Sequence, residues 1–473
     1  MAADPLPDWL APLPDAEQMR AVDAWAIEEQ RVPSLELMER AGAQAARVAQ
    51  VEFTDAARWT VVCGGGSNGG DGRIMARHLE SAGKAVRIVE AKASEPDLGE
   101  PDVIVDALFG TGFSGSPRDD AAAMIERINS SPAAVFAIDL PSGIDASTGE
   151  VAGAAVHADA TVTFHGRKVG IVVAPGRFHA GRVHVTDIGL EHVETAMRLA
   201  TAELLRSVPR RHEGDNKYTA GNVLVVGGSR GFTGAPSLSA LAAMRADAGY
   251  VTVAAPASSL PVLEQRLLEA VKRPLAETDD GIVAASAVES VLEIAHKASS
   301  LAIGPGLGRG DGAKELVRRV LAEVELPVVA DADALFELEP ATWAGPRVLT
   351  PHEGELARLL GRTSAEIAAH RLASVQEAVE RFSCVVLLKG PDTLLAAPGA
   401  GTIVVSLGLP SLATAGTGDV LTGIVAAFLA KGLEPQRAAA AAAVAQQLAS
   451  VEAPQRAGLV ASDLIDALPR VLR

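Results

Sequence analysis

The chain has 473 residues and a formal net charge of −17 at neutral pH. A domain usually has roughly 100–200 residues, so this length predicts two or more domains. Hydrophobic residues make up 48% of the sequence, and its 45 glycines are typical of α/β proteins, in which glycine turns join apolar strands and helices. The acidic balance excludes nucleic acid as an expected partner, because that binding relies on clustered Lys and Arg.

Nothing in the sequence indicates secretion or a membrane partner. Cys63 and Cys384 lie in apolar runs and form neither a disulfide framework nor a metal-binding spacing. Residues 1–14 carry acidic residues and prolines where a signal peptide needs basic and apolar ones. The longest apolar stretches, such as 420–430, fall short of the roughly 18 residues of a membrane helix. We therefore expect a cytoplasmic, soluble protein.

The first half alternates strands and helices. The elements expected in chain order are two helices within 16–51 separated at Pro33, a strand at 59–63, a glycine-rich turn at 64–72, a helix at 73–82, strands at 85–90 and 103–108, a helix at 121–128, and strands at 134–139, 160–164 and 182–187. This order predicts a Rossmann-like, doubly wound domain.

The second half repeats this pattern after a polar helix and a Pro-Arg-Arg-His segment within 191–211, where we place the boundary between domains 1–205 and 206–473. Strands are expected at 222–226, 251–255, 301–303, 328–331, 348–349, 385–388 and 402–405. Continuous apolar runs are typical of parallel strands buried on both faces, so a second α/β domain is expected.

The turn at 414–419, Thr-Ala-Gly-Thr-Gly-Asp, precedes an apolar helix. Its backbone N–H groups and the positive end of the helix favour a bound phosphate. Asp419 would serve as a base or ligand there, with an ordinary capping aspartate as the alternative. Glycine-rich or polar loops also follow strands at 227–236, 304–308 and 350–355, and loops at the carboxyl ends of strands can share one crevice.

These segments together resemble the ribokinase-like ADP/ATP-dependent NAD(P)H-hydrate dehydratases over residues 210–473. The resemblance is carried by Gly227-Gly228-Ser229, Gly304-Pro305-Gly306-Leu307-Gly308, Thr350-Pro351-His352-Glu353-Gly354-Glu355, Leu388-Lys389-Gly390-Pro391-Asp392-Thr393 and Gly416-Thr417-Gly418-Asp419. The segment Lys217-Tyr218-Thr219-Ala220-Gly221 also resembles the motif at the start of this family's domain, with Asn216 where a His is common.

The resemblance implies a ribokinase-like fold, ADP or ATP as co-substrate and a magnesium ion, with ADP preferred. It assigns the nucleotide to Lys389, Gly390, Pro391, Asp392, Thr393 and Gly418, and the hydrated dinucleotide to Ala235, Gly306, His352 and Asp419. Asp419 would activate the C6 hydroxyl of the hydrated ring while the turn amides form an anion hole.

In the first half, Gly64, Gly66 and Gly69 satisfy G-x-G-x-x-G after a strand, and Glu90 ends the next strand. That is the fingerprint of NAD-dependent dehydrogenases, and a dehydrogenase remains one alternative. Asn68 and Asp71 are not needed for it. Asp106 and Asp139 end later strands, so three polar loops on one sheet edge suggest a site.

The segments 37–42, 68–72, 106–112 and 138–143 resemble the NAD(P)H-hydrate epimerases over about residues 15–190, with Ser67 where the family usually has Asn. The resemblance implies a potassium ion held by Asn68, Asp106 and Ser142, whose oxygens suit a hard cation. It implies a dinucleotide site lined by Ser67, Asn68, Gly69, Gly70, Asp71, Gly110, Thr111, Gly112, Phe113, Ser114, Gly115, Ser116 and Asp139. Lys168 is a candidate for contacting a phosphate.

Together the two resemblances imply that the chain epimerises the R and S forms of NAD(P)HX, the hydrate of NAD(P)H, and dehydrates the S form. Asp139 or Asp71 is the candidate for epimerase proton transfer. The alternatives are a ribokinase-type small-molecule kinase and a non-catalytic N-terminal module that binds a dinucleotide or a protein. The expected partners are small molecules, NAD(P)HX and ADP or ATP, and we expect a homo-oligomer.

Overall fold

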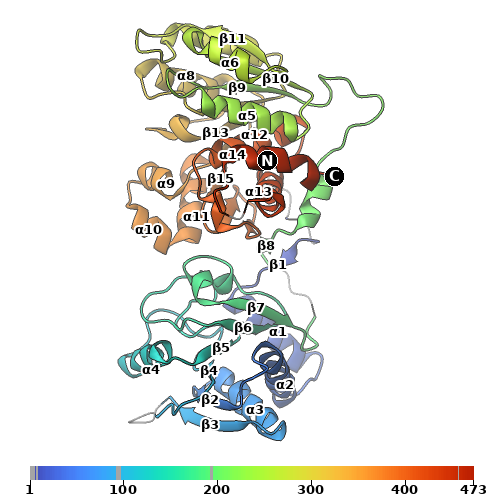
Figure 1. Ribbon diagram of the computed structural model, residues 1–473, viewed down its shortest axis with the longest axis vertical. Helices are drawn as coiled ribbons and strands as arrows, with labels where there is room; N and C mark the ends of the chain where they lie inside the picture. The colour runs from blue at the N-terminus through green and yellow to red at the C-terminus, as the bar shows by residue number, and fades with distance from the viewer. Residues whose placement is uncertain (1–5, 7–8, 92–96, 192–194, 456) are drawn as a thin grey trace. The chain divides into compact units, whose positions relative to one another are not determined.

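The computed structural model describes residues 6, 9–91, 97–191, 195–455 and 457–473 (Figure 1). The chain forms two compact units. The N-terminal unit comprises Pro12–Arg198 with Ala368–Leu372, and the C-terminal unit comprises Leu199–Ile367 and Ala373–Arg473 with the described part of Met1–Ala11. Leu10, which we expected in the first domain, is buried in the core of the C-terminal unit.

The N-terminal unit is built on a parallel sheet. Within the described ranges its strand order is β3-β2-β4-β5-β6-β7. The strands are β2 Arg58–Cys63, β3 Ala85–Glu90, β4 Val103–Ala107, β5 Ala134–Ile138, β6 Ala160–Phe164 and β7 Arg182–Thr186, and the helices are α1 Ala16–Glu28, α2 Ser34–Glu52, α3 Ser67–Ser81 and α4 Asp119–Ser130. The predicted doubly wound architecture is confirmed.

Both faces of this sheet are covered, because successive strand residues point to opposite sides. Val61 and Cys63 pack in a core with α2 and α3, whereas Val62 between them packs in a second core with α4. Such two-sided burial explains why the strands are continuous apolar runs.

The glycine-rich turn expected at 64–72 is shorter than predicted, because α3 already begins at Ser67. The glycines allow close packing. A Cβ at Gly72 would lie 2.6 Å from the Ala107 Cβ, and one at Gly69 would lie 1.9 Å from the Gly64 carbonyl oxygen. Gly69 and Gly72 therefore bring the first turns of α3 against the ends of β2 and β4.

The larger sheet has the order β1-β8-β17-β16-β15-β14-β13-β12-β9-β10-β11 in the described part of the chain. Its strands are β1 Ala11–Pro12, β8 Met197–Leu199, β9 Asn222–Val226, β10 Tyr250–Pro256, β11 Val271–Leu275, β12 Ser300–Ile303, β13 Val328–Ala330, β14 Arg347–Leu349, β15 Val385–Leu388, β16 Thr393–Ala396 and β17 Thr402–Val405. In the part of this sheet that runs β15-β14-β13-β12-β9-β10-β11, all neighbouring strands pair in parallel.

Two expectations for this half were wrong. β16 was not predicted, and the sheet is not parallel throughout, because β16 pairs antiparallel with both β15 and β17. The connection from β15 to β16 is short, and a short connection can join two neighbouring strands only as an antiparallel hairpin. The polar helix expected within 191–211 is replaced, in its described part, by β8 and a 3₁₀ helix at Ala202–Ser207.

Helices cover both faces of the central strands. One core contains buried residues of α5 Gly234–Arg245, α6 Leu260–Arg266, α12 Thr417–Ala430, α13 Pro435–Glu452 and α14 Ala461–Val471. The other contains residues of α7 Val288–Ala295, α8 Asp311–Glu323, α9 Glu353–Leu360 and α11 Arg371–Phe382. The short helix α10 Ser364–Ala369 lies between α9 and α11 in the sequence.

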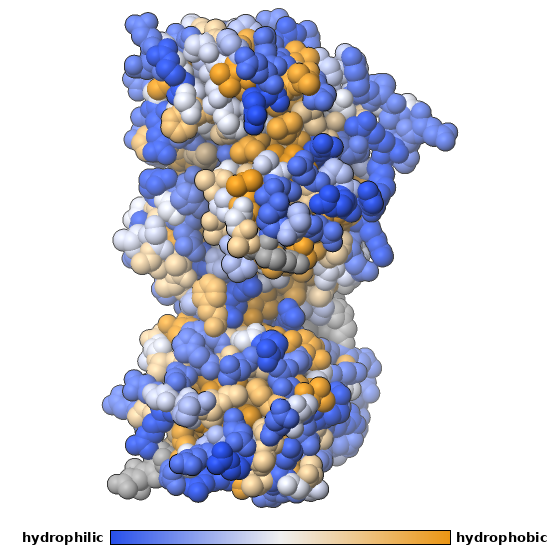
Figure 2. All heavy atoms as spheres, in the orientation of Figure 1, coloured by the Kyte–Doolittle hydropathy of each residue, from blue (hydrophilic) through white to orange (hydrophobic). Residues whose placement is uncertain are grey.

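The surface is mixed in character. Hydrophilic residues cover much of the face seen in Figure 2, with hydrophobic residues in small scattered groups. None of the helices in the described ranges is both long enough and apolar enough to cross a membrane.

Candidate active sites

The N-terminal unit has a cavity of about 750 Å³ at the carboxyl ends of β2 and β4. β3 and β4 flank β2, so the strand order reverses here, which is where open α/β sheets bind ligands. Of the residues expected at the dinucleotide site, those lining the cavity are Ser67, Asn68, Asp71, Gly110, Thr111, Gly112, Phe113, Ser114 and Asp139. Gly69 instead packs against Gly64, and Gly70 faces the Met38 sulfur.

Asp139 is held by an ion pair inside this cavity. Its Oδ1 lies 2.7 Å from the Lys168 Nζ, and its Oδ2 accepts a hydrogen bond from the Thr111 N–H at 3.2 Å. Asp139 has a φ of 69°, a conformation that non-glycine residues rarely adopt. Strain of this kind clusters at functional sites, where surrounding contacts maintain it.

Lys168 does not have the free ammonium group that a phosphate ligand would need. Its side chain is 1% exposed. Besides the ion pair with Asp139, its Nζ donates to the Thr163 Oγ1 and to the Phe164 carbonyl oxygen, each at 2.8 Å. An ammonium group has three hydrogens, and here each has an acceptor. The phosphate contact suggested at Lys168 therefore stays a prediction.

Asp71 differs from Asp139 in its protonation. Burial, and then the charges of Asp139 and Asp23, raise the pKa of Asp71 to about 8, although Lys168 opposes the shift. Asp71 is therefore mostly protonated at neutral pH, beside an Asp139 whose charge is paired. Asp23, on α1, lines the same cavity, and sequence analysis missed it because no motif surrounds it.

Asn68, Asp106 and Ser142 are linked by hydrogen bonds through the Phe109 backbone. The Ser142 Oγ and N–H donate to the two Asp106 carboxylate oxygens at 2.6 and 2.7 Å. The Asn68 Nδ2 donates to the Phe109 carbonyl oxygen at 2.8 Å, which leaves the buried Asn68 Oδ1 without a partner. Burial raises the pKa of Asp106 to about 6.

This oxygen set fits a hard cation. The set consists of the Asp106 carboxylate, the Ser142 hydroxyl, the Phe109 carbonyl oxygen and the Asn68 amide oxygen. The Asn68 oxygen is buried without a hydrogen-bond partner, which destabilises the protein unless a ligand binds it. Among the described residues, no group of three or more His, Cys, Asp or Glu side chains could hold a metal ion.

In the C-terminal unit, loops after neighbouring strands contact one another. The Ser229 Oγ, after β9, donates to the Gly306 carbonyl oxygen, after β12, at 2.9 Å. The Gly308 N–H donates to Asp333, after β13, at 3.0 Å. A Cβ at Gly306 would lie 3.3 Å from the Ala235 Cβ, so these two predicted substrate contacts are neighbours.

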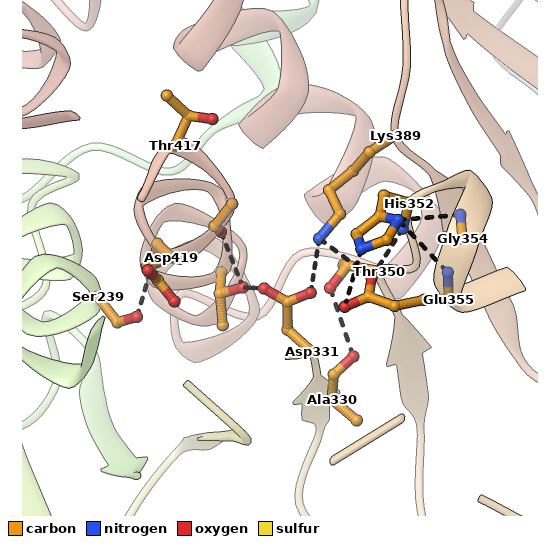
Figure 3. A network of polar contacts seen from close by, with 12 residues as sticks. Ser239, Ala330, Asp331, Thr350, His352, Gly354, Glu355, Lys389, Thr417 and Asp419 are labelled. Carbon is orange, nitrogen blue, oxygen red and sulfur yellow. Dashed lines mark hydrogen bonds and ion pairs between the residues drawn. The ribbon is translucent and has the colours of Figure 1, made fainter. Parts of the chain in front are cut away.

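Lys389 and Asp331 form the centre of a polar network at this edge (Figure 3). The Lys389 Nζ lies 2.7 Å from the Asp331 Oδ1 and 3.8 Å from the Glu355 Oε2. The Thr422 Oγ1, on α12, donates to the Asp331 Oδ2 at 2.7 Å. Asp331, which is 1% exposed, thereby ties β13 to β15 and α12.

Asp419 lies in the first turn of α12, because the helix begins at Thr417. The helix cap is Gly416, with a φ of 89° and no capping side chain, so Asp419 is not an ordinary N-cap. Burial, and then the charge of Asp331, raise the pKa of Asp419 to about 7, although Lys389 opposes the shift. Asp419 is thus poised to accept a proton near neutral pH.

The other predicted residues of this unit lie in different surroundings. His352 caps α9, since its Nδ1 accepts from the Gly354 N–H at 3.0 Å, and its side chain is 56% exposed. Gly390 and Pro391 are exposed between β15 and β16, whereas Asp392 and Thr393 are buried. The Thr393 Oγ1 accepts from the Gln447 Nε2 at 3.2 Å.

Sequence analysis missed Asp331, Glu355 and Thr422 as site residues. Asp331 follows a strand directly, as Asp139 does in the first half, and that same signal was available. Thr422 carries no comparable signal, because its role depends on α12 packing beside β13.

Comparisons with known proteins agree with this geometry. The family described as NAD(P)H-hydrate dehydratase matches residues 223–470, and the family described as YjeF-related protein N-terminus matches residues 34–98 and 88–170. The bifunctional NAD(P)H-hydrate repair enzyme Nnr of Moorella thermoacetica is 39% identical over 97% of this chain and 96% of its own length. The enzyme of the same name from Escherichia coli is 33% identical over 97% and 93%.

Solved structures also align with more than half of the chain. The ADP/ATP-dependent NAD(P)H-hydrate dehydratase of Bacillus subtilis, co-crystallised with ATP and Mg²⁺, aligns with a TM-score of 0.51 at 29% identity, over 57% of this chain and 96% of that chain. A ribokinase-like superfamily protein of Enterococcus faecalis aligns with a TM-score of 0.52 at 24% identity, over 60% and 97%, and supports the ribokinase-like fold. Both predicted resemblances are confirmed: the chain belongs to the family of bifunctional NAD(P)H-hydrate repair enzymes.

Proposed function

We propose that this chain repairs hydrated NADH and NADPH in two steps. The N-terminal unit interconverts the R and S forms at C6, and the C-terminal unit dehydrates the S form with a nucleoside phosphate as co-substrate. The observation that carries the proposal is the meeting of Asp419, Asp331 and Lys389 at the start of α12, in a family of repair enzymes.

In the dehydration, Asp419 accepts the proton of the C6 hydroxyl, and the oxygen attacks the terminal phosphorus of the nucleotide. The bond from that phosphorus to the bridging oxygen breaks, and the nucleotide leaves with one phosphate fewer. The open N–H groups at the start of α12 stabilise the negative charge on the transferred group. The C6–O bond then breaks, inorganic phosphate leaves, and C5 gives up a proton to solvent water, which restores the double bond of the reduced ring. Lys389 supplies positive charge beside Asp419, and Asp331 holds Lys389 in place.

The test is Asp419→Asn in the full chain, supplied with S-NADHX and ADP, with NADH absorbance as the readout. We expect the dehydration rate to fall roughly 10²–10⁴-fold, the usual contribution of a general base. The exposed Asp466 on α14 offers a control, and Asp466→Asn should retain the wild-type rate. Full turnover by Asp419→Asn would exclude Asp419 as the base.

For epimerisation we assign the base to Asp139 and the acid to Asp71. Asp139 is paired with the Lys168 ammonium, whereas Asp71 holds its proton at neutral pH. C6 is a hemiaminal carbon, because it carries a hydroxyl group and is bonded to the ring nitrogen. It can invert when one group removes the hydroxyl proton and another protonates the ring nitrogen as the C6–N bond breaks and a carbonyl forms. Closure on the opposite face reverses both transfers.

A potassium ion fits the oxygens of Asn68, Asp106 and Ser142. The buried Asn68 Oδ1 without a partner supports the assignment. When bound, the ion supplies positive charge beside Asp106 and fixes the Phe109 loop. The protein's own part is to hold the donors in place through the hydrogen bonds from Ser142 to Asp106.

The nucleotide is proposed to lie near Lys389, Gly390, Pro391, Asp392, Thr393 and Gly418, and the substrate near Ala235, Gly306, His352 and Asp419. The Bacillus subtilis dehydratase crystallised with ATP and Mg²⁺ supports a nucleotide and a magnesium ion here. The preference for ADP, the homo-oligomer, the cytoplasmic location and the domain boundary near 205 stay predictions. A ribokinase-type kinase activity is not favoured, and phosphorylation of a hydroxymethylpyrimidine or sugar in place of NADHX dehydration would reverse this view.

A further inference from the structure

The N-terminal cavity presents an electrostatic problem for a dinucleotide substrate. Such a substrate carries a pyrophosphate, and NADPHX carries one more phosphate. Yet the lining includes the carboxyl groups of Asp23, Asp71 and Asp139. The charge of Asp139 is already paired with that of Lys168, so an anion that enters this cavity needs another cation that is free to meet it.

Two cationic side chains, Lys168 and Arg20, are among the described residues that line the cavity. Lys168 is already saturated, because its ammonium hydrogens are directed to Asp139, Thr163 and the Phe164 carbonyl oxygen. Arg20 is exposed at the surface of α1. The positive charge available to a phosphate in this lining is therefore that of Arg20.

The face of α1 also places Arg20 suitably. Met19, Arg20, Asp23 and Ile27 line the cavity at helical spacing, whereas Val22 and Ala26 are buried away from it. Asp23 is close enough to Asp139 and Lys168 for their charges to affect its pKa. Arg20 lies about one turn, or roughly 5 Å along the axis, from Asp23. A phosphate at Arg20 can thus lie outside the reacting ring while the ring stays near Asp71 and Asp139.

We propose that Arg20 binds a phosphate of the dinucleotide and so anchors the epimerase substrate. The inference rests on the proposed epimerase function of this cavity. A guanidinium group can donate two parallel hydrogen bonds to one phosphate, which gives orientation as well as charge. Arg20 is a binding residue and takes no part in proton transfer.

The experiment uses the full chain without any nucleotide, so that dehydration does not occur, and follows conversion of R-NADHX and R-NADPHX to the S forms by chromatography. For Arg20→Gln we expect KM to rise roughly tenfold or more while kcat stays within about twofold, and Arg20→Lys should recover part of the loss. The control is Arg47→Gln on α2, since the exposed Arg47 contacts Gln44 and does not line the cavity.

A similar rise in KM for both substrates would assign Arg20 to the pyrophosphate, and a rise for NADPHX alone would assign it to the 2′-phosphate. Wild-type KM should also rise with salt more steeply than that of Arg20→Gln. An Arg20→Gln KM equal to that of Arg47→Gln, or a fall in kcat at constant KM, would overturn this inference alone. If the wild-type chain did not interconvert the epimers at all, both the epimerase proposal and the assignment of Arg20 would be wrong.

Discussion

Asp419 is the residue whose surroundings bear most directly on the chemistry of the C-terminal unit. Its pKa of about 7 reflects burial and the nearby charge of Asp331, which outweigh the opposing charge of Lys389. A base acts in its ionised form, so dehydration should become faster as pH rises through the pKa.

We therefore expect kcat/KM for dehydration of S-NADHX to rise with a midpoint near pH 7. In Asp331→Asn the midpoint should move to lower pH, because the charge that raises the Asp419 pKa is gone and Lys389 loses its closest carboxylate. The pH profiles of wild type, Asp331→Asn and the control Asp466→Asn would measure this. A midpoint in Asp331→Asn that stayed in place or moved upward would contradict the assignment.

Asp71 should impose the opposite pH dependence on epimerisation. Its pKa is raised to about 8 by burial and by Asp139 and Asp23, so the proton it donates is lost as pH rises through that value. We expect the enzymatic rate, corrected for reaction without protein, to decline above pH about 8. Asp23→Asn should move this decline to lower pH. A rate that instead rises through pH 8 would make Asp71 the base.

The sequence predicted part of each candidate site. The segments carrying Asp139, Asp106 and Asp419 were singled out because each follows a strand or precedes a helix. The saturation of Lys168 and the tie between Asp331 and Thr422 could not be predicted, because they join side chains that only the tertiary fold brings together.

At the scale of elements, the glycines of α3 set how closely this helix approaches the sheet. An alanine normally favours a helix over glycine by roughly 1 kcal/mol. At Gly72, however, the new Cβ would lie 2.6 Å from the Ala107 Cβ and 3.2 Å from the Cys63 Sγ.

We expect Gly72→Ala to lower the free energy of unfolding of the N-terminal unit by roughly 1–3 kcal/mol, the usual cost of overpacking. Gly65→Ala is the matched control, since a Cβ at Gly65 meets nothing within 4 Å. Scanning calorimetry should show an unfolding transition at lower temperature for Gly72→Ala and at the wild-type temperature for Gly65→Ala. An unchanged or higher transition in Gly72→Ala would refute the close-packing account.

The elements themselves were largely predictable where apolar runs are continuous, as in β2, β9 and β15. β11 was missed because Lys272, Arg273 and Pro274 interrupt its pattern at the edge of the sheet. The start of α3 was misplaced because three glycines among its first six residues usually indicate a loop, whereas here they permit packing.

At the scale of the whole molecule, the two activities are complementary in stereochemistry. A dehydratase that accepts only the S form leaves the R form unused, and an epimerase on the same chain converts that remainder.

The most direct test of this account supplies racemic NADHX with ADP or ATP to the full chain and follows NADH absorbance. We predict conversion of essentially all of the hydrate, with the second half formed far faster than spontaneous epimerisation allows. Asp139→Asn should slow the reaction sharply near half conversion, and Asp419→Asn should form almost no NADH. A wild-type reaction that stopped near one half would contradict the epimerase assignment, and one that formed no NADH with either nucleotide would contradict the repair function itself.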